Sequence, residues 1–262
     1  MYVLISNDDG IDSPGIKALE EAAKQVFEEV AVVAPLTQQS GVSHGLSLNK
    51  PLYCKRYDEN HWGLGGRPAD CVFLALKRIL PKQPDLVISG INLGPNMGID
   101  TVYSGTTGAA REALINGIMS VAFSFGSVSH FNFEAVAPWT VKILQSIRGL
   151  IEQGEPAMMF NVNFPSLEDH GPVKGMKACS LGHRVFADTT FEWQDPRGGK
   201  WLWLGGARLD MAGTEDSDTH WLPQGYVTIT PMLWNMYECG GRKHAEDIAE
   251  RISGTSAKEQ GK

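Results

Sequence analysis

The sequence predicts a three-layer α/β/α sandwich with a Rossmann-like, mostly parallel sheet and a β-rich C-terminal extension. Two observations predict this α/β class. Over residues 1 to about 125, short apolar runs typical of strands alternate with segments of helical periodicity, which is the pattern of βαβ units. Beyond Pro165 that periodicity stops, and Gly, Pro, Asp and aromatic residues become frequent, including five of the seven tryptophans.

Local signals predict each element in turn. The run Val3-Leu4-Ile5 is an uninterrupted apolar strand, and the next segment carries Ile16 and Leu19 at helical spacing. Pro68 suits the first turn of a later helix. The predicted strands are 2–6, 30–34, 46–53, 85–89, 118–125, 158–162 and 226–230. The predicted helices are 14–27, 68–80, 106–116, 136–152 and a short one near 244–252.

The length of 262 residues predicts one large α/β domain, or one domain with an elaborated second half. We expect residues 1–165 to form the α/β core that carries the functional site. Residues 166–253 are predicted to form a hairpin-rich extension that returns one strand, 226–230, and covers the site. Exposed aromatic hairpins often mark interfaces, so this extension is also expected to serve oligomerisation. Residues 254–262 are a predicted flexible, polar tail.

Composition excludes several classes of protein. Apolar residues make up 42% and charged residues 20%, as in ordinary globular proteins. With 23 basic and 30 acidic residues, the net charge of −7 argues against binding of a nucleic-acid polymer. No apolar run is long enough to span a membrane, and no basic leader opens the sequence, which predicts a cytoplasmic protein without a membrane partner. The four widely spaced cysteines, Cys54, Cys71, Cys179 and Cys239, are predicted to be core thiols in a reducing compartment.

Three polar loops follow predicted strands, at the edge where open α/β sheets bind ligands. The first loop holds the adjacent carboxylates Asp8 and Asp9, for which an Asx-rich turn is the alternative interpretation. The second carries the hydroxyl of Ser40, and the third carries Asn92. These four side chains form an all-oxygen set, which suits one hard divalent cation, Mg²⁺ or Mn²⁺.

Residues 104–108 place hydroxyl groups at a predicted helix start. Ser104, Gly105 and Thr106 would combine side-chain hydroxyls with unpaired backbone N–H groups, which is a favourable site for an anion. Ordinary N-capping by Ser104 or Thr106 is the alternative. A hard cation beside an anion-binding helix start is typical of phosphoryl chemistry.

Residues 41–45 match the G-x-S-x-G pattern of a serine hydrolase, with Ser43 as the nucleophile. The pattern requires a strand, a turn and a helix, whereas a strand is predicted to follow here. A serine hydrolase that uses Ser43 is therefore an alternative that the sequence disfavours. The glycines of the 89–98 loop do not have the spacing of a dinucleotide fingerprint, and no Walker A motif is present.

Ordered motifs along nearly the whole chain resemble the SurE family, the stationary-phase survival proteins. The motifs are LISNDDGI with PGI (4–11, 14–16), VAP leading to SG (33–35, 40–41), PADCV (68–72), SGINLGPNMG (89–98), YSGT (103–106), NVNFP (161–165) and GYVTITP (225–231). Members of this family are metal-dependent 5′-nucleotidases. The resemblance therefore implies a hydrolase with one divalent cation per subunit.

The resemblance also implies roles for individual residues. Asp8, Asp9, Ser40 and Asn92 fall on the positions of the metal ligands. The implied phosphate contacts are Asn96, Ser104, Gly105 and Thr106, and the implied catalytic residues are Asp8, Asp9 and Asn96. Subunits of the family form dimers or tetramers in which C-terminal elements cross between subunits. Arg67 departs from the family, which usually has Thr at this position. The arginine would either alter substrate access or have no role beyond its place at a helix start. His44 is a candidate substrate contact.

The predicted reaction is hydrolysis of a nucleoside monophosphate to a nucleoside and phosphate, with a polarised water as nucleophile. An aspartyl-phosphate intermediate on Asp8 or Asp9 is the mechanistic alternative. A nucleotide-binding module without turnover is the non-catalytic alternative. The sequence leaves open the preferred base, the metal used in the cell, and whether 3′-nucleotides or short polyphosphates are also cleaved.

Overall fold

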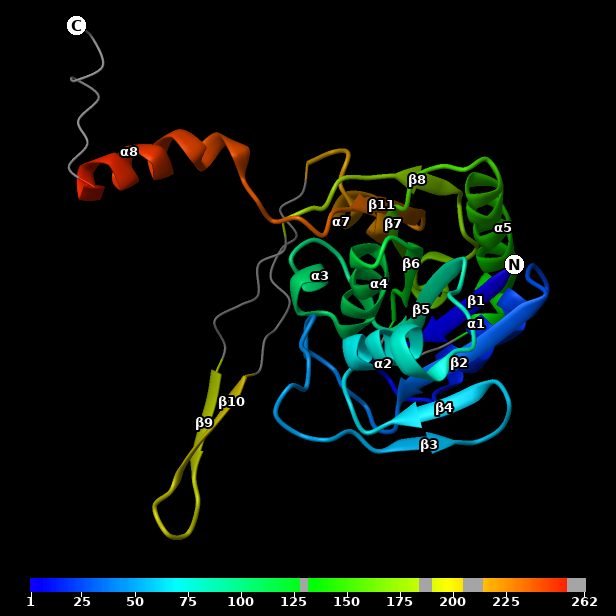
Figure 1. Cartoon of the computed structure of the whole chain (residues 1–262), viewed down its shortest axis with the longest axis horizontal. Helices are drawn as coiled ribbons and strands as arrows, with labels where there is room; N and C mark the ends of the chain where they lie inside the picture. Colours follow the sequence, from blue (N-terminus) through cyan, green and yellow to red (C-terminus); the bar gives the residue numbers. More distant parts are fainter. Residues whose placement is uncertain (128–131, 184–189, 205–213, 254–262) are drawn as a thin grey trace, which may run out of the picture. The chain divides into compact units, whose positions relative to one another are not determined.

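A nine-stranded sheet with the order β3-β4-β2-β1-β5-β6-β7-β11-β8 forms the centre of the computed structural model, which describes residues 1–127, 132–183, 190–204 and 214–253 (Figure 1). Strands β4, β2, β1, β5, β6 and β7 are parallel, β3 and β11 are antiparallel to β4 and β7, and β8 is parallel to β11. The strands of this sheet are β1 (Tyr2–Ser6), β2 (Glu29–Pro35), β3 (Cys54–Arg56), β4 (His61–Leu64), β5 (Leu86–Leu93), β6 (Met119–Phe125), β7 (Met159–Phe164), β8 (Met176–Ala178) and β11 (Val227–Met232).

Helices cover both faces of this sheet, which makes the predicted three-layer arrangement. Helix α1 (Pro14–Lys24) contacts α5 (Phe133–Glu152), and α2 (Pro68–Leu74) contacts α4 (Gly105–Ile115). The alternation along β1 separates the two layers, because Val3 and Ile5 belong to one apolar cluster and Leu4 to the other. Burial on both faces explains why this strand is apolar throughout. The short helices are α3 (Asp100–Tyr103), α6 (Leu167–His170), α7 (Asp218–Trp221) and the 3₁₀ turns η2 (Leu222–Gln224) and η3 (Cys239–Gly241).

The chain divides into two units, Met1–Met232 and Leu233–Lys262. The change of composition at Pro165 does not coincide with this division, because β8 and β11 both join the main sheet. The extension thus returns β8 in addition to the expected strand. Its other strands, β9 (Thr190–Gln194) and β10 (Lys200–Leu204), form a separate antiparallel hairpin. The second unit contains η3 and α8 (Arg242–Ser253), while the predicted tail 254–262 lies outside the described residues.

Two predictions about local structure were wrong. Residues 46–53 form no strand, and β4 instead takes the place beside β2. The alternation of Leu46, Ser47 and Leu48 has no sheet to bury it, since the Leu48 side chain is 83% exposed. Helix α2 ends at Leu74 and continues as a π-helix, η1 (Ala75–Ile79), instead of remaining α-helical to residue 80.

The expectation that all four cysteines are core thiols holds for half of them. All four thiols are free, but only Cys71 and Cys179 are buried, whereas Cys54 and Cys239 are exposed. Cys54 is exposed because β3 is a short strand at the edge of the sheet, where few neighbours cover it. Cys239 lies in the second unit, in an exposed 3₁₀ turn.

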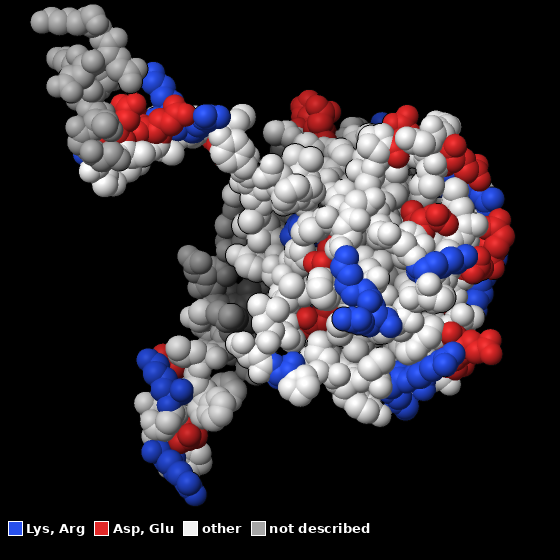
Figure 2. All heavy atoms as spheres, viewed as in Figure 1, with Lys and Arg blue, Asp and Glu red and all other residues white. Residues whose placement is uncertain are grey.

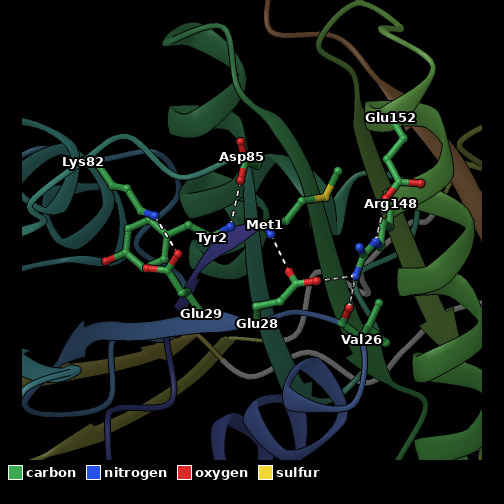
Figure 3. Close-up of polar contacts among 9 residues, drawn as sticks. All are labelled: Met1, Tyr2, Val26, Glu28, Glu29, Lys82, Asp85, Arg148 and Glu152. Atoms are coloured by element: carbon green, nitrogen blue, oxygen red, sulfur yellow. Dashed lines mark hydrogen bonds and ion pairs between the residues drawn. The ribbon is translucent and has the colours of Figure 1, made fainter.

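Charged side chains close the amino edge of the parallel strands. Arg148 in α5 donates to the carbonyl oxygen of Val26 (2.6 Å) and pairs with Glu28 (3.1 Å) and Glu152 (2.8 Å) (Figure 3). The amino group of Met1 also contacts Glu28, and these contacts hold the pKa of the Glu28 carboxyl at about 2. These ion pairs therefore join α5 to the amino ends of the strands, opposite the edge that carries the polar loops.

The described residues carry both signs of charge over the face shown in Figure 2, with Lys and Arg among Asp and Glu and much uncharged surface between them. Within the described part of the chain, no helix has the length and apolar character needed to cross a membrane.

Candidate active site

The three polar loops lie together at the carboxyl edge of the sheet. β1 pairs in parallel with β2 on one side and with β5 on the other, and Ser6 is level with Ser89. Asp8 and Asp9 follow β1 after one residue, Asn7, and Asn92 lies near the end of β5. The register of β5 against β6 shifts between Ser89 and Asn92, and an irregularity of this kind re-aims side chains at the end of a strand.

Asn7, and not the neighbouring aspartates, makes the turn after β1. Its side-chain amide donates to the carbonyl oxygen of Gly10 (2.9 Å) and to the hydroxyl of Ser13 (2.8 Å), and its oxygen accepts from the Gly10 N–H (3.2 Å). Gly10 has a φ of +103°, which a glycine adopts without strain. The Asx-turn alternative is therefore correct for Asn7, which leaves Asp8 and Asp9 available for another role.

Asp8 is buried against the first turn of α4. Its carboxylate accepts a hydrogen bond from the Thr106 hydroxyl, and its side chain is only 4% exposed. A Cβ at Gly105 would lie 2.8 Å from the Asp8 Cβ, so only glycine permits this approach. Burial raises the pKa of the Asp8 carboxyl to about 6; the Thr106 hydrogen bond lowers it, and the Asp9 charge raises it further. Ionised Asp8 is consequently costly without a neighbouring cation.

Asp9 contacts the end of β5, the strand that carries Asn92. Asp9 accepts from the backbone N–H of Leu93 (3.2 Å) and from the side chain of Gln38. Burial raises the pKa of Asp9 despite these two hydrogen bonds. The Asn92 amide nitrogen donates to the carbonyl oxygen of Gly94 (2.7 Å), so its side chain can offer the oxygen to a cation.

The loop after β2 is joined to the loop after β1 by a backbone hydrogen bond. The N–H of Gln39, the residue before Ser40, donates to the main-chain carbonyl oxygen of Asp8 (2.7 Å). Ser40 itself is exposed. No sequence signal predicts the contact of Gln38 with Asp9, because a glutamine in a polar loop has many ordinary roles.

The polar groups at the start of α4 cap the helix and contact Asp8. Ser104 is the N-cap and accepts from the N–H of Thr107 (3.1 Å). The Thr106 hydroxyl donates to the Asp8 carboxylate, and the backbone N–H of Thr106 also interacts with it. An anion bound by Thr106 would therefore compete with Asp8 for both groups. The first N–H groups of a helix have no acceptor within the helix, and those of Gly105 and Thr106 occupy that position.

Asn96 is fixed by four hydrogen bonds to side chains of β6 and β7. Its N–H donates to Asn163 (2.8 Å), its side-chain amide donates to Ser124 (2.8 Å), and its carbonyl oxygen accepts from Asn161 (2.8 Å) and Asn163 (3.0 Å). Sequence reasoning did not give Asn161 and Asn163 a function. Both asparagines are fully buried in β7, an otherwise apolar strand, and two polar residues in such a strand are the signal that could have identified them.

The residues of the G-x-S-x-G pattern do not form a serine nucleophile and base. The Ser43 hydroxyl donates to the carbonyl oxygen of Val102 (2.6 Å), and the neighbouring His44 pairs with Glu112 of α4 (2.7 Å) instead of Ser43. These contacts do not support a serine hydrolase that uses Ser43. The strand expected after the pattern is also absent. The pair of His44 with Glu112, which spacing could not predict, ties the Ser40 loop to α4.

The donor set fits a hard cation better than a transition metal bound by His or Cys. Asp8 and Asp9 form no ion pair with any residue that the structure describes, and two adjacent, largely buried carboxylates without a cation are unfavourable. No group of three or more His, Cys, Asp or Glu side chains suited to a metal occurs in the described part of the chain. Two carboxylates completed by hydroxyl and amide oxygens are the set that Mg²⁺ or Mn²⁺ accepts.

A three-layer α/β fold with an oxygen-donor site beside a helix N-terminus defines a class of metal-dependent, phosphate-handling proteins. A family model described as "Survival protein SurE" matches residues 3–188. The chain belongs to the SurE family.

Individual relatives and a solved structure agree with this membership. The chain is 41% identical over 237 residues to the "5′-nucleotidase SurE" of Gemmatimonas aurantiaca, covering 88% of this chain and 92% of that protein. It is 40% identical over 241 residues to the protein of the same name from Moorella thermoacetica, with 88% and 90% covered. The crystal structure of the SurE protein from Aquifex aeolicus superposes with a TM-score of 0.81 at 37% identity, covering 95% of this chain and 100% of that chain.

Proposed function

We propose that this chain is a metal-dependent phosphohydrolase, a 5′-nucleotidase that releases phosphate from nucleoside 5′-monophosphates. The observation that carries the proposal is the pair Asp8 and Asp9, two carboxylates without a cationic partner among the described residues. Asp8 packs at the N-terminus of α4, and Asp9 contacts the end of β5. The relatives named above are 5′-nucleotidases by name, at about 40% identity over most of the chain.

Asp8, Asp9, Ser40 and Asn92 would hold the cation, Mg²⁺ or Mn²⁺. When bound, the cation supplies a Lewis acid that polarises a phosphoryl oxygen. The N–H groups of Gly105 and Thr106 and the Ser104 hydroxyl would bind the phosphoryl oxygens and stabilise their charge in the transition state. Asn96 would contact the same group from its rigid loop.

The reaction replaces one phosphorus–oxygen bond by another. A water oxygen bonds to phosphorus, the bond to the 5′-oxygen breaks, and that oxygen takes up a proton as the nucleoside leaves. A carboxylate oxygen of Asp8 or Asp9 would accept the proton of the attacking water. Attack by the carboxylate itself is the rival path, and trapping of a phosphoenzyme would decide for it.

A phosphate-release assay tests this function. We expect release from a panel of nucleoside monophosphates with Mg²⁺ or Mn²⁺, loss of release with a chelator, and recovery when the cation is restored. Nucleotide binding without release would identify a binding module. Activity that survives the chelator, together with labelling of Ser43 by an organophosphonate, would identify a serine hydrolase and overturn the proposal.

We also propose that the chain assembles into a homodimer or homotetramer through its C-terminal extension. One face of the β9–β10 hairpin is aromatic: Phe191, Trp193, Trp201 and Trp203 share it and are each more than half exposed. The Lys200–Glu192 ion pair (2.8 Å) lies on the other face. A two-stranded hairpin alone is marginally stable in water, so an exposed aromatic face on it favours a protein partner.

We further propose a cytoplasmic location, which the four free thiols support.

Sedimentation velocity tests the assembly. We expect a dimer or tetramer of the 28.6 kDa chain, and a shift toward the monomer in the Trp193→Ser, Trp203→Ser double variant. The matched control is Glu192→Gln, which changes the charged face of the same hairpin and should leave the assembly intact. A wild-type chain that sediments only as a 28.6 kDa species would contradict the proposal.

A further inference from the structure

A pocket of about 620 Å³ lies between the loop after β2 and the turn that precedes α2. This volume falls within the range of small-molecule sites and exceeds what one phosphate needs. Leu36, Leu46 and Leu48 supply apolar wall, while Gln39 and Asn49 supply amide groups. A wall of this kind suits a nucleoside, which has a flat, apolar face and a polar edge.

The pocket adjoins the proposed metal and phosphate site on two sides. Gln39 lines the pocket, and its N–H is bonded to the carbonyl oxygen of Asp8. On the other side, Arg67 lines the pocket and precedes Pro68, whose ring packs on Gly105, as Asp8 does. A substrate whose phosphate lies at the start of α4 can therefore extend its leaving group into this pocket.

Two cations face the pocket without an acidic partner. Lys50 and Arg67 both line it, and neither forms an ion pair with any residue in the described ranges. No Asp or Glu is among the lining residues. The Arg67 guanidinium lies against the backbone of Gly45, and the Arg67 N–H is bonded to Asp70 (2.8 Å), which fixes where the side chain begins.

We propose that this pocket binds a leaving group that itself carries a phosphate, so that the preferred substrates are nucleotides with a second phosphate on the ribose. This inference rests on the proposed function. A neutral nucleoside would satisfy the leucine wall but leave both cations without an anion. A second phosphate would accept charge-assisted hydrogen bonds from Arg67, whose planar fork matches phosphate oxygens, and from Lys50. Arg67 is the specificity-determining residue of this pocket.

The test compares kcat/KM for adenosine 3′,5′-bisphosphate and for adenosine 5′-monophosphate, measured by phosphate release with Mn²⁺. We expect the wild-type ratio to be at least about ten, and Arg67→Gln to lower it by about tenfold, the effect of one charge-assisted hydrogen bond. The matched control, Arg78→Gln, removes the same charge from the exposed end of η1 outside the pocket and should keep the wild-type ratio.

Three outcomes would overturn the inference while leaving the proposed function intact. They are a wild-type ratio of one or less, a ratio that Arg67→Gln does not change, and an equal loss of ratio in Arg78→Gln. Tripolyphosphate tests whether the second phosphate must be carried by a nucleoside. We expect its kcat/KM to be lower than that of the bisphosphate, because it has no nucleoside to contact the leucine wall. An equal or higher value would show that the pocket does not bind a nucleoside. Absence of phosphate release from every substrate would instead contradict the proposed function itself.

Discussion

Asp8→Asn is expected to lower kcat/KM for nucleoside monophosphates by about a hundredfold or more, and to weaken Mn²⁺ binding in calorimetry. The substitution keeps the size of the side chain but removes one of the two negative charges that would hold the cation. Losing one pre-organised charge contact to a transition state costs about this much in other enzymes. Retained activity with unchanged Mn²⁺ affinity would remove Asp8 from the proposed site.

The same substitution is expected to raise the melting temperature of the protein in the presence of a chelator. Burial raises the pKa of Asp8 to about 6, so at neutral pH the folded chain carries a charge that the unfolded chain accommodates more easily. The neutral amide avoids that cost. Loss of activity together with a gain in stability would separate a functional defect from misfolding. Asp12→Asn, on an exposed residue of the same loop, is the control and should change neither quantity.

Gly105→Ala is expected to lower kcat/KM by about ten- to a hundredfold and to weaken Mn²⁺ binding. Helix propensity alone would favour alanine at this position by about 1 kcal/mol. The new Cβ, however, would lie 2.8 Å from the Asp8 Cβ and 3.0 Å from the Pro68 ring, so the carboxylate must move. A displacement of about 1 Å at a catalytic group commonly costs this much in rate.

Gly149→Ala in α5 is the matched control for this substitution. A Cβ at Gly149 meets no atom within 4 Å, so the same chemical change acts there only through helix propensity. We expect a gain of about 0.5–1 kcal/mol in the free energy of unfolding, measured with urea, and no change in activity. If Gly105→Ala behaved like Gly149→Ala in both measurements, Asp8 would have room to move without loss of function.

Much of the fold could be predicted because its signals are local. The run that forms β1 is apolar on both faces, and its predicted bounds agree with the structure. The spacing of Ile16 and Leu19 likewise predicted the buried face of α1, although the helix ends at Lys24, three residues early. Residues 46–53 were mistaken for a strand because alternation specifies a strand only where a neighbouring strand buries one face.

The sequence by itself determined the class of fold, the family and the chemistry available at the carboxyl edge, since these follow from residue types in ordered motifs. Only the tertiary structure decided which contact each of those residues makes. Asn7 forms the turn after β1, Thr106 bonds to Asp8, and His44 pairs with Glu112. The last two pairs join atoms 98 and 68 residues apart in the chain. Hydrogen bonds between such distant segments depend on how strands and helices pack, which no local pattern encodes.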